Sequence, residues 1–402
     1  MCSRCRWSAA SRKASWCLTS AGGTSRWPSR PTCRASRAGN CLARQRGAAA
    51  RIHIFVPGQL GTPTWKDRSS DYGQEEFDIR QADRRIGEVP AGAGISDAAA
   101  ERLFAAAGLD LAALKKAATR RDFRPVVLNA RASLRVRQTL REVESRNVVA
   151  RIEGSDPKLR HEWLIYTAHW DHFGRDPTRP SDQIFNGAFD NASGVAAMLE
   201  VAKEFAALKT PPKRSILFLI TTAEEQGLLG AKHYVQQPLY PLERTLAVLN
   251  TDGINVCGRT RDIGIVGFGR STLADRLAGI ATARGRVALG DTLPHLRLFY
   301  RSDHKEFAAA GVPAVWMRRG LDFPGKPADY GRKSVAEYLA NHYHKVSDEV
   351  RDDWDLSGAV EYYRLYFLLG VDIANGDAWP RWKPGDEVAS KRDEMLKRAR
   401  AR

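Results

Sequence analysis

Residues 215–230 read SILFLITTAEEQGLLG. The opening run is mostly apolar and follows Pro211 and Pro212, which is typical of a strand covered on both faces of a parallel sheet. The polar residues after this strand include Glu224 and Glu225, whose adjacent carboxylates repel each other. A bound cation offsets such repulsion. This stretch therefore predicts a parallel sheet with a charged site at its edge.

Strands and helices alternate on both sides of this stretch, from residue 147 onward. A helix with one apolar face is predicted at residues 191–208, and a largely apolar helix at residues 357–374. Further strands are predicted at residues 163–168, 246–250, 263–266 and 314–317. The alternation predicts an α/β fold with a mainly parallel central sheet flanked by helices.

Acidic and histidine side chains recur where the predicted strands end or the helices begin. They lie in five segments: TAHWD (167–171), NGAFDNASG (186–194), TTAEE (221–225), NTD (250–252) and NHYHKVSD (341–348). In open α/β sheets, ligands bind outside the carboxyl ends of the strands. Each segment alone is also typical of a surface ion pair or a helix cap. The prediction of a shared site therefore rests on their coincidence in one chain.

In this order the segments resemble the co-catalytic zinc aminopeptidases of metallopeptidase family 28, from about residue 147 to about residue 375. Further matching segments are SDHKEF (302–307) and GVPA (311–314). The resemblance implies the phosphorylase/hydrolase-like fold of zinc exopeptidases. It also implies a zinc-dependent metallopeptidase that removes N-terminal residues from peptides through a water activated by two zinc ions.

The resemblance implies five metal ligands. His169 and Asp252 would bind one zinc ion. Glu225 and His344 would bind the second, and Asp190 would bridge both. Imidazole and carboxylate groups are suitable zinc ligands, so the residue types agree with these implied roles.

Two further residues would act beside the metal. By the same resemblance, Glu224 would be the general base and Asp171 would orient His169. Three other histidines are not expected to be ligands: His172, His233 and His342. The tripeptide Ser302-Asp303-His304 raises the alternative of a serine hydrolase. A catalytic triad must converge in space rather than adjoin in sequence, and we expect a turn here, close to the substrate pocket.

Other functions remain open on this scaffold. A glutaminyl-cyclase-like transferase would use a single zinc ion, and a carboxypeptidase-type relative would act at the other end of the peptide. A receptor-like domain with a relic site is the non-enzymatic alternative, although such domains usually lack ligands that are all present here. The expected partners are peptide substrates, and the sequence indicates neither a preferred N-terminal residue nor an oligomeric state.

The formal net charge of +17 is concentrated at the N-terminus. Residues 1–50 carry ten of the 63 basic residues and none of the 46 acidic residues, so the rest of the chain is at +7. A charge confined to one terminal segment does not indicate nucleic-acid binding. The same segment holds five of the six cysteines, so no disulfide framework is predicted for the body. This composition fits a disordered arm, a mis-assigned start or a gene read in the wrong frame, and we favour the last.

The chain is expected to contain five regions: an atypical basic head (1–50), a partial protease-associated domain (51–95), a helical connecting region (96–146), a zinc peptidase domain (147–380) and a charged tail (381–402). The second region is assigned by a weaker resemblance. Runs of 18 or more apolar residues are absent, so no transmembrane helix is predicted. The first 25 residues lack the apolar segment of a secretory signal, whereas the resemblance implies a periplasmic or secreted protein.

Overall fold

The computed structural model describes residues 47–55, 64–66, 75–80, 91–120, 122–137 and 139–401. The chain divides into two compact units. One comprises Met1–Glu76 and Arg80–Glu142, and the other comprises Phe77–Ile79 and Val143–Arg402. Most of the predicted basic head, with its five cysteines, lies outside the described residues, and the predictions for it remain predictions.

Among its described residues, the first unit contains two strands and two helices with a small core. The strands β1 (Ala50–Ile54) and β2 (Ala91–Ile95) pair in parallel. The helices α3 (Asp97–Ala106) and α4 (Leu111–Ala117) follow them. Ser96 caps α3, because its hydroxyl accepts a hydrogen bond from the backbone N–H of Ala99 at 3.1 Å. A helix therefore begins directly after Ser96, within the region expected to be helical.

The second unit is built around a seven-stranded sheet with the strand order β10-β9-β11-β8-β4-β7-β3. In chain order the strands are β3 (Val148–Ile152), β4 (Trp163–His169), β7 (Ser215–Thr221), β8 (Thr245–Asn250), β9 (Asp262–Val266), β10 (Val287–Leu289) and β11 (Ala314–Arg319). The central strands β11, β8, β4 and β7 run parallel to one another. Strand β9 pairs antiparallel with β11 and parallel with β10, and β3 pairs antiparallel with β7. The predicted mainly parallel sheet is confirmed, with edges of opposite direction.

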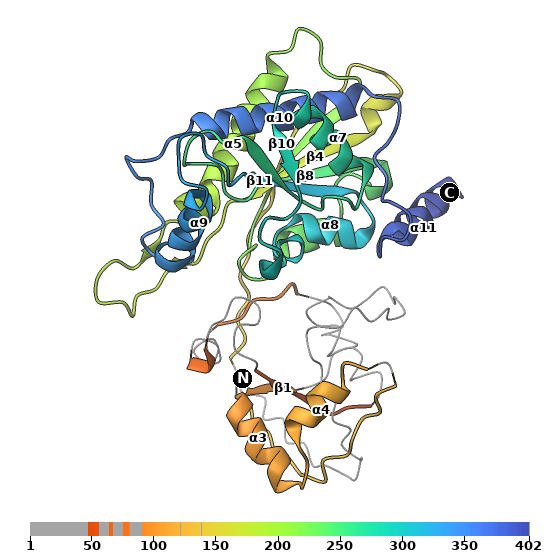
Figure 1. The fold of residues 1–402 in the computed structure, drawn as a ribbon. Helices are drawn as coiled ribbons and strands as arrows, with labels where there is room; N and C mark the ends of the chain where they lie inside the picture. The colour runs from red at the N-terminus through yellow and green to blue at the C-terminus, as the bar shows by residue number, and fades with distance from the viewer. Residues whose placement is uncertain are drawn as a thin grey trace. The chain divides into compact units, whose positions relative to one another are not determined.

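Helices cover both faces of this sheet (Figure 1). One face is covered by α5 (Ser193–Ala206), α7 (Thr272–Thr282) and α10 (Ser357–Asn375), and the other by α6 (Leu229–Gln236), α8 (His304–Ala310) and α11 (Ala389–Arg400). Every residue of β4 and β8 is buried, which explains why these strands read as continuous apolar runs. None of the helices in the described part of the chain is long and apolar enough to cross a membrane.

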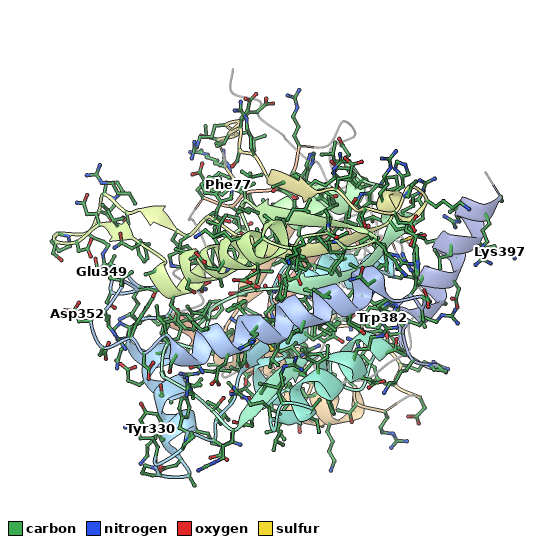
Figure 2. All side chains as sticks on the ribbon, turned by 90° about the horizontal axis from the view of Figure 1, so that it is seen from above. Phe77, Tyr330, Glu349, Asp352, Trp382 and Lys397 are labelled. Atoms are coloured by element: carbon green, nitrogen blue, oxygen red, sulfur yellow. The ribbon has the colours of Figure 1, made fainter. Side chains whose placement is uncertain are left out.

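The charged C-terminal segment contributes a helix to the second unit. In α11 the side chain of Arg392 is buried and donates hydrogen bonds to the carbonyl oxygens of Leu242 at 3.0 Å and Thr245 at 2.6 Å. Figure 2 shows Trp382 and Lys397 at one end of the unit and Glu349 at the other. This helix therefore supports the sheet at a distance from the segment around residue 349.

The predicted element boundaries shift where the polar segments begin. Strand β4 includes His169, whose side chain is only 1% exposed. Helix α5 begins at Ser193, two residues later than predicted, because Asp190 and Asn191 have non-helical backbone angles. The turn Ala188–Ala192 before it therefore presents Asp190 from a loop.

Candidate metal centre

Three neighbouring strands bring the first polar residues of the centre together. His169 ends β4, the Glu224-Glu225 pair follows β7, and Asp252 follows β8. Because β4 pairs in parallel with both β7 and β8, the carboxyl ends of the three strands lie side by side. The loop before α5 adds Asp190, and the segment after helix α9 (Tyr330–Asn341) adds a histidine.

The carboxylate of Asp190 lies between two histidines. Its Oδ1 atom is 3.3 Å from Nε2 of His169, which is also 3.7 Å from Oδ1 of Asp252. Its Oδ2 atom is 3.6 Å from Nε2 of His344, which is 3.2 Å from Oε2 of Glu225. The structure therefore brings together all five residues predicted as ligands, with Asp190 facing both halves of the group.

Their chemistry fits bound metal ions. The buried Nε2 atoms of His169 and His344 have no hydrogen-bond partner in the described part of the chain, although both face carboxylate oxygens. His169, Asp190 and Asp252 each offer one ligand atom within 4.8 Å of the other two, and so do His172, Asp190 and Glu225. Unpartnered imidazole nitrogens that converge with carboxylates are the donor set that zinc prefers.

His172, which was not expected to be a ligand, lies in this centre. Its Nδ1 atom is 2.8 Å from Oε1 of Glu225, and its buried Nε2 atom has no partner among the described residues. Glu225 thus has one oxygen toward His172 and the other toward His344. His172 is an additional candidate that either orients Glu225 or binds metal. Because the chain turns after β4, no pattern in the sequence indicates the direction of this side chain.

The two acidic residues that resemblance places beside the metal are linked to each other. Glu224 is buried, and its Oε2 atom lies 3.9 Å from Nε2 of His169. Its backbone N–H donates a hydrogen bond to Oδ1 of Asp171 at 3.1 Å. The carbonyl oxygen of Asp171 lies 3.1 Å from Nδ1 of His169, whereas its carboxylate is 3.9 Å away. Asp171 therefore contacts His169 through its backbone and Glu224 through its side chain.

Burial and crowded charge shift the pKa values of these groups in different directions. Burial, followed by the charge of Glu225, raises the pKa of Asp190 to about 6. Burial also raises the pKa of Glu225, but His172 and His344 outweigh it and hold the pKa at about 2. Burial raises the pKa of Glu224 well above its ordinary value, against the opposing effect of His169. Several carboxylates in so little space favour a cation that offsets their repulsion.

Two residues that the sequence analysis did not single out hold the loops in place. The carboxylate of Asp348 is buried and accepts hydrogen bonds from the backbone N–H groups of Phe189 and Asp190, both at 3.0 Å. The side-chain oxygen of Asn191 accepts hydrogen bonds from the N–H groups of Gly194 at 3.1 Å and Gly253 at 2.9 Å. The loops that carry Asp190 and Asp252 are thereby fixed to each other and to residue 348.

The Ser302-Asp303-His304 tripeptide does not form a catalytic triad. The hydroxyl of Ser302 accepts a hydrogen bond from Asn250 at 2.8 Å, and the carboxylate of Asp303 accepts one from the hydroxyl of Thr221. The ring of His304 packs instead against the aromatic rings of two other residues, Phe299 and Trp316. The three side chains have different partners, as expected for a turn before α8.

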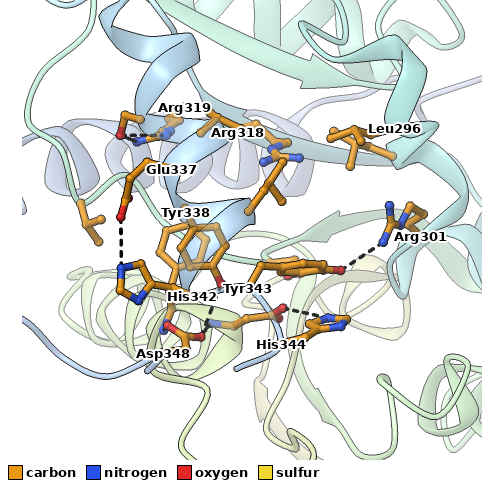
Figure 3. Close-up of a pocket in the computed structure, with 18 of the residues that line it drawn as sticks. Leu296, Arg301, Arg318, Arg319, Glu337, Tyr338, His342, Tyr343, His344 and Asp348 are labelled. Atoms are coloured by element: carbon orange, nitrogen blue, oxygen red, sulfur yellow. Dashed lines mark hydrogen bonds and ion pairs between the residues drawn. The ribbon is translucent and has the colours of Figure 1, made fainter. Parts of the chain in front are cut away.

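A cavity of about 350 Å³ adjoins the centre (Figure 3). At one end its wall includes the carboxylates of the centre together with His344. The rest of the wall combines charged side chains, Arg318 among them, with apolar and aromatic ones such as Leu296, Leu298, Trp316, Val335 and Tyr338. Helix α9 supplies part of this wall. The cavity is of the size and composition in which one amino-acid side chain could be held next to the metal ligands.

Known proteins resemble this chain over the same region. Residues 147–368, more than half of the chain, match Peptidase family M28. An aminopeptidase of Pseudomonas aeruginosa is 32% identical over 224 residues, which cover 52% of this chain and 38% of that protein. A vacuolar membrane protease of Lodderomyces elongisporus is 28% identical over 220 residues, which cover 53% of this chain and 19% of that protein. The chain thus spans well under half the length of these relatives.

Solved structures include similar chains. An aminopeptidase from Aneurinibacillus sp. strain AM-1 gives a TM-score of 0.46 at 20% identity. The match covers 89% of this chain and 69% of the aminopeptidase chain. A peptidase precursor from Shewanella amazonensis gives a TM-score of 0.45 at 22% identity, with coverages of 86% and 65%. The family match includes all five predicted ligands and the Glu224 position. The chain belongs to Peptidase family M28.

Proposed function

We propose that this chain is a zinc-dependent aminopeptidase that holds two metal ions and hydrolyses the N-terminal residue from peptides. The observation that carries the proposal is the Asp190 carboxylate, whose two oxygens face His169 at 3.3 Å and His344 at 3.6 Å. A carboxylate in that position suits a bridging ligand. Family membership and the name of the Pseudomonas aeruginosa relative support the reaction class.

The metal would be held in two sets that share one residue. His169 and Asp252 would hold one ion, Glu225 and His344 the other, and Asp190 both. Bound zinc supplies Lewis-acid activation of a water molecule and of the substrate carbonyl. The residues of the chain must then move a proton and orient the peptide.

Glu224 is the residue best placed to move that proton. Its side chain lines the cavity, and its Oε2 atom lies 3.9 Å from Nε2 of His169. Its raised pKa suits a carboxylate that accepts a proton from water and passes it to the leaving amine. The hydrogen bond from its backbone to Asp171 fixes the start of this segment. Glu224 would therefore be the general base.

Metal analysis combined with a substrate panel tests this function. The purified protein should contain two zinc ions per chain and cleave aminoacyl p-nitroanilides, and a strong chelator should abolish the cleavage. N-acetylated versions of the same substrates should not be cleaved, because an aminopeptidase requires a free amine. Full activity with one bound zinc would contradict the two-metal site, and cleavage only at free C-termini would favour the carboxypeptidase-type alternative. An exported location, implied by the family resemblance, is a separate expectation.

A further inference from the structure

An arginine with no hydrogen-bond or ion-pair partner among the described residues lines the cavity beside the candidate metal centre. Arg318 lies near the carboxyl end of β11, the strand that pairs in parallel with β8. Its guanidinium lies over the ring of Trp316, 4.8 Å from the ring centre, and both residues line the cavity. Within the described residues, its side chain forms no hydrogen bond or ion pair. Figure 3 shows Arg318 and His344 well separated across the pocket.

Two other arginines of this wall have neutral partners, whereas a third, Arg351, pairs with Asp353 at 3.0 Å. Arg319 donates hydrogen bonds to Sγ of Cys257 at 2.7 Å and to the hydroxyl of Ser334 at 3.3 Å. Arg301 donates one to the hydroxyl of Tyr343 at 3.1 Å. The carboxylates of the candidate centre thus line one end of the cavity. Elsewhere in its wall, Arg301, Arg318 and Arg319 have no carboxylate partner among the described residues.

A nearby carboxylate, Glu337, is already engaged. It lies 3.2 Å from Nε2 of His342 and accepts a hydrogen bond from Asn341 at 3.3 Å. The contacts of Glu337 therefore leave Arg318 without a counter-ion from this part of the wall.

The surroundings of Arg318 favour an anionic ligand. Arg318 is half-buried. Burial lowers its pKa and the charge of Asp252 opposes that effect, so the guanidinium lies within the field of the candidate metal centre. A charge removed from water without a partner is costly, and a carboxylate that forms paired hydrogen bonds with it offsets that cost. The planar guanidinium is the side chain best suited to such a bidentate contact.

We propose that the cavity selects peptides with an acidic N-terminal residue, and that Arg318 binds the side-chain carboxylate of that residue. The inference rests on the proposed function. In an aminopeptidase the first residue has no chain before it, so its amine and carbonyl lie at the metal end and its side chain extends into the adjoining cavity. The two ends of the cavity then match the two charges of an N-terminal glutamate or aspartate.

Kinetics with three p-nitroanilides test the assignment, because these substrates carry no C-terminal carboxylate. We expect kcat/KM for the glutamyl substrate to exceed that for the isosteric glutaminyl substrate by on the order of 10- to 100-fold, the usual range for a charged hydrogen-bonded pair. Arg318→Leu should remove this preference while leaving kcat/KM for the leucyl substrate unchanged or higher. Arg318→Lys, which keeps the charge but not the planar group, should retain part of it.

Arg261→Leu is the matched control, since Arg261 is exposed, pairs with Asp322 at 2.8 Å and lies outside the cavity wall. It should leave the glutamyl preference intact. Equal rates for glutamyl and glutaminyl substrates in the wild type would overturn the proposal. So would an equal loss for all three substrates in folded Arg318→Leu, which would make Arg318 a structural residue.

Two further measurements separate the remaining outcomes. If dipeptides with a free C-terminus are favoured over amidated ones and Arg318→Leu abolishes that difference, Arg318 binds the terminal carboxylate and the side-chain assignment is wrong. If no aminoacyl substrate is cleaved, the proposed function fails, and calorimetric titration of the zinc-loaded protein with glutamate and glutamine decides the subsite. Binding of glutamate alone, lost in Arg318→Leu, supports the subsite, and equal binding of both contradicts it.

Discussion

The carboxyl ends of β4, β7 and β8 and the carboxyl end of β11 lie along one edge of the same sheet but carry opposite charges. The first three lead into His169, Glu225 and Asp252, whereas β11 ends in Arg318 and Arg319. The acidic end, formed where β4, β7 and β8 finish, has several groups in mutual contact, and under the proposed function the removal of any of them should affect the reaction itself. The basic end has contacts that only some substrates would use. If both proposals hold, chemistry and selectivity are divided between neighbouring strands.

The largest effect that separates the two ends is expected from Glu224→Gln. Glutamine keeps the shape of the side chain but cannot accept the proton, so kcat should fall on the order of 10²–10⁴-fold. The loss should be the same for leucyl and glutamyl substrates, unlike the selective loss expected for Arg318→Leu. Steady-state kinetics and zinc analysis of the same preparation measure both quantities, and zinc content should be retained.

Glu225→Gln is the matched comparison, because the two positions are adjacent in the chain. Glu225 faces His344 and would hold metal, so its substitution should lower zinc occupancy first, with activity partly restored by excess zinc. If Glu224→Gln loses zinc and Glu225→Gln does not, the two roles are reversed. If neither variant lowers turnover tenfold, the acidic end does not carry out the reaction.

A smaller effect on the acidic end is expected from Asp348→Asn. Each carboxylate oxygen of Asp348 accepts one backbone N–H of the Asp190 loop, whereas asparagine would direct its own NH₂ group toward one of these donors. Zinc affinity should fall roughly 10- to 100-fold, the usual effect of losing a residue that orients a ligand. Competition with a chelator measures this affinity. Asp352→Asn, at an exposed position, is the control, and an unchanged affinity in folded Asp348→Asn would refute the positioning role.

The strands and the ligands were predictable for different reasons. The central strands are buried along their length and therefore read as apolar runs, and polar segments mark where they end. The roles of Asp190 and His344 came from the family resemblance rather than from spacing. The contact of Asp348 with the loop before α5 joins residues 158 positions apart, and nothing local in the sequence indicates it.

Other features could not be read from the sequence because they depend on tertiary contacts. His172 reaches Glu225 only through the turn after β4. An arginine near the end of a strand is common, and the significance of Arg318 lies in its having no partner within the described structure. Helix α11 is highly charged and shows little apolar periodicity, although it contains a buried arginine. In each case the local sequence pattern is a common one, and only the tertiary contacts of the side chain distinguish it.

The smallest effect on activity is expected at Arg392, the buried arginine of α11, which is not part of the cavity wall. Arg392→Met keeps the apolar part of the side chain but removes the donors to the carbonyl oxygens of Leu242 and Thr245, which lie on the side of the sheet covered by α8 and α11. Losing two buried charged hydrogen bonds should lower the free energy of unfolding by about 2–4 kcal/mol. Below the unfolding transition, kcat/KM should stay unchanged for both leucyl and glutamyl substrates, because the hydrogen bonds of Arg392 lie outside the cavity wall.

Urea unfolding measures the change in the free energy of unfolding. In the control variant Arg398→Met, at an exposed position on the same helix, this free energy should change by less than about 0.5 kcal/mol. A change in the ratio of glutamyl to leucyl activity in Arg392→Met would show that selectivity extends beyond the end of β11, and the division between the two ends would then be wrong.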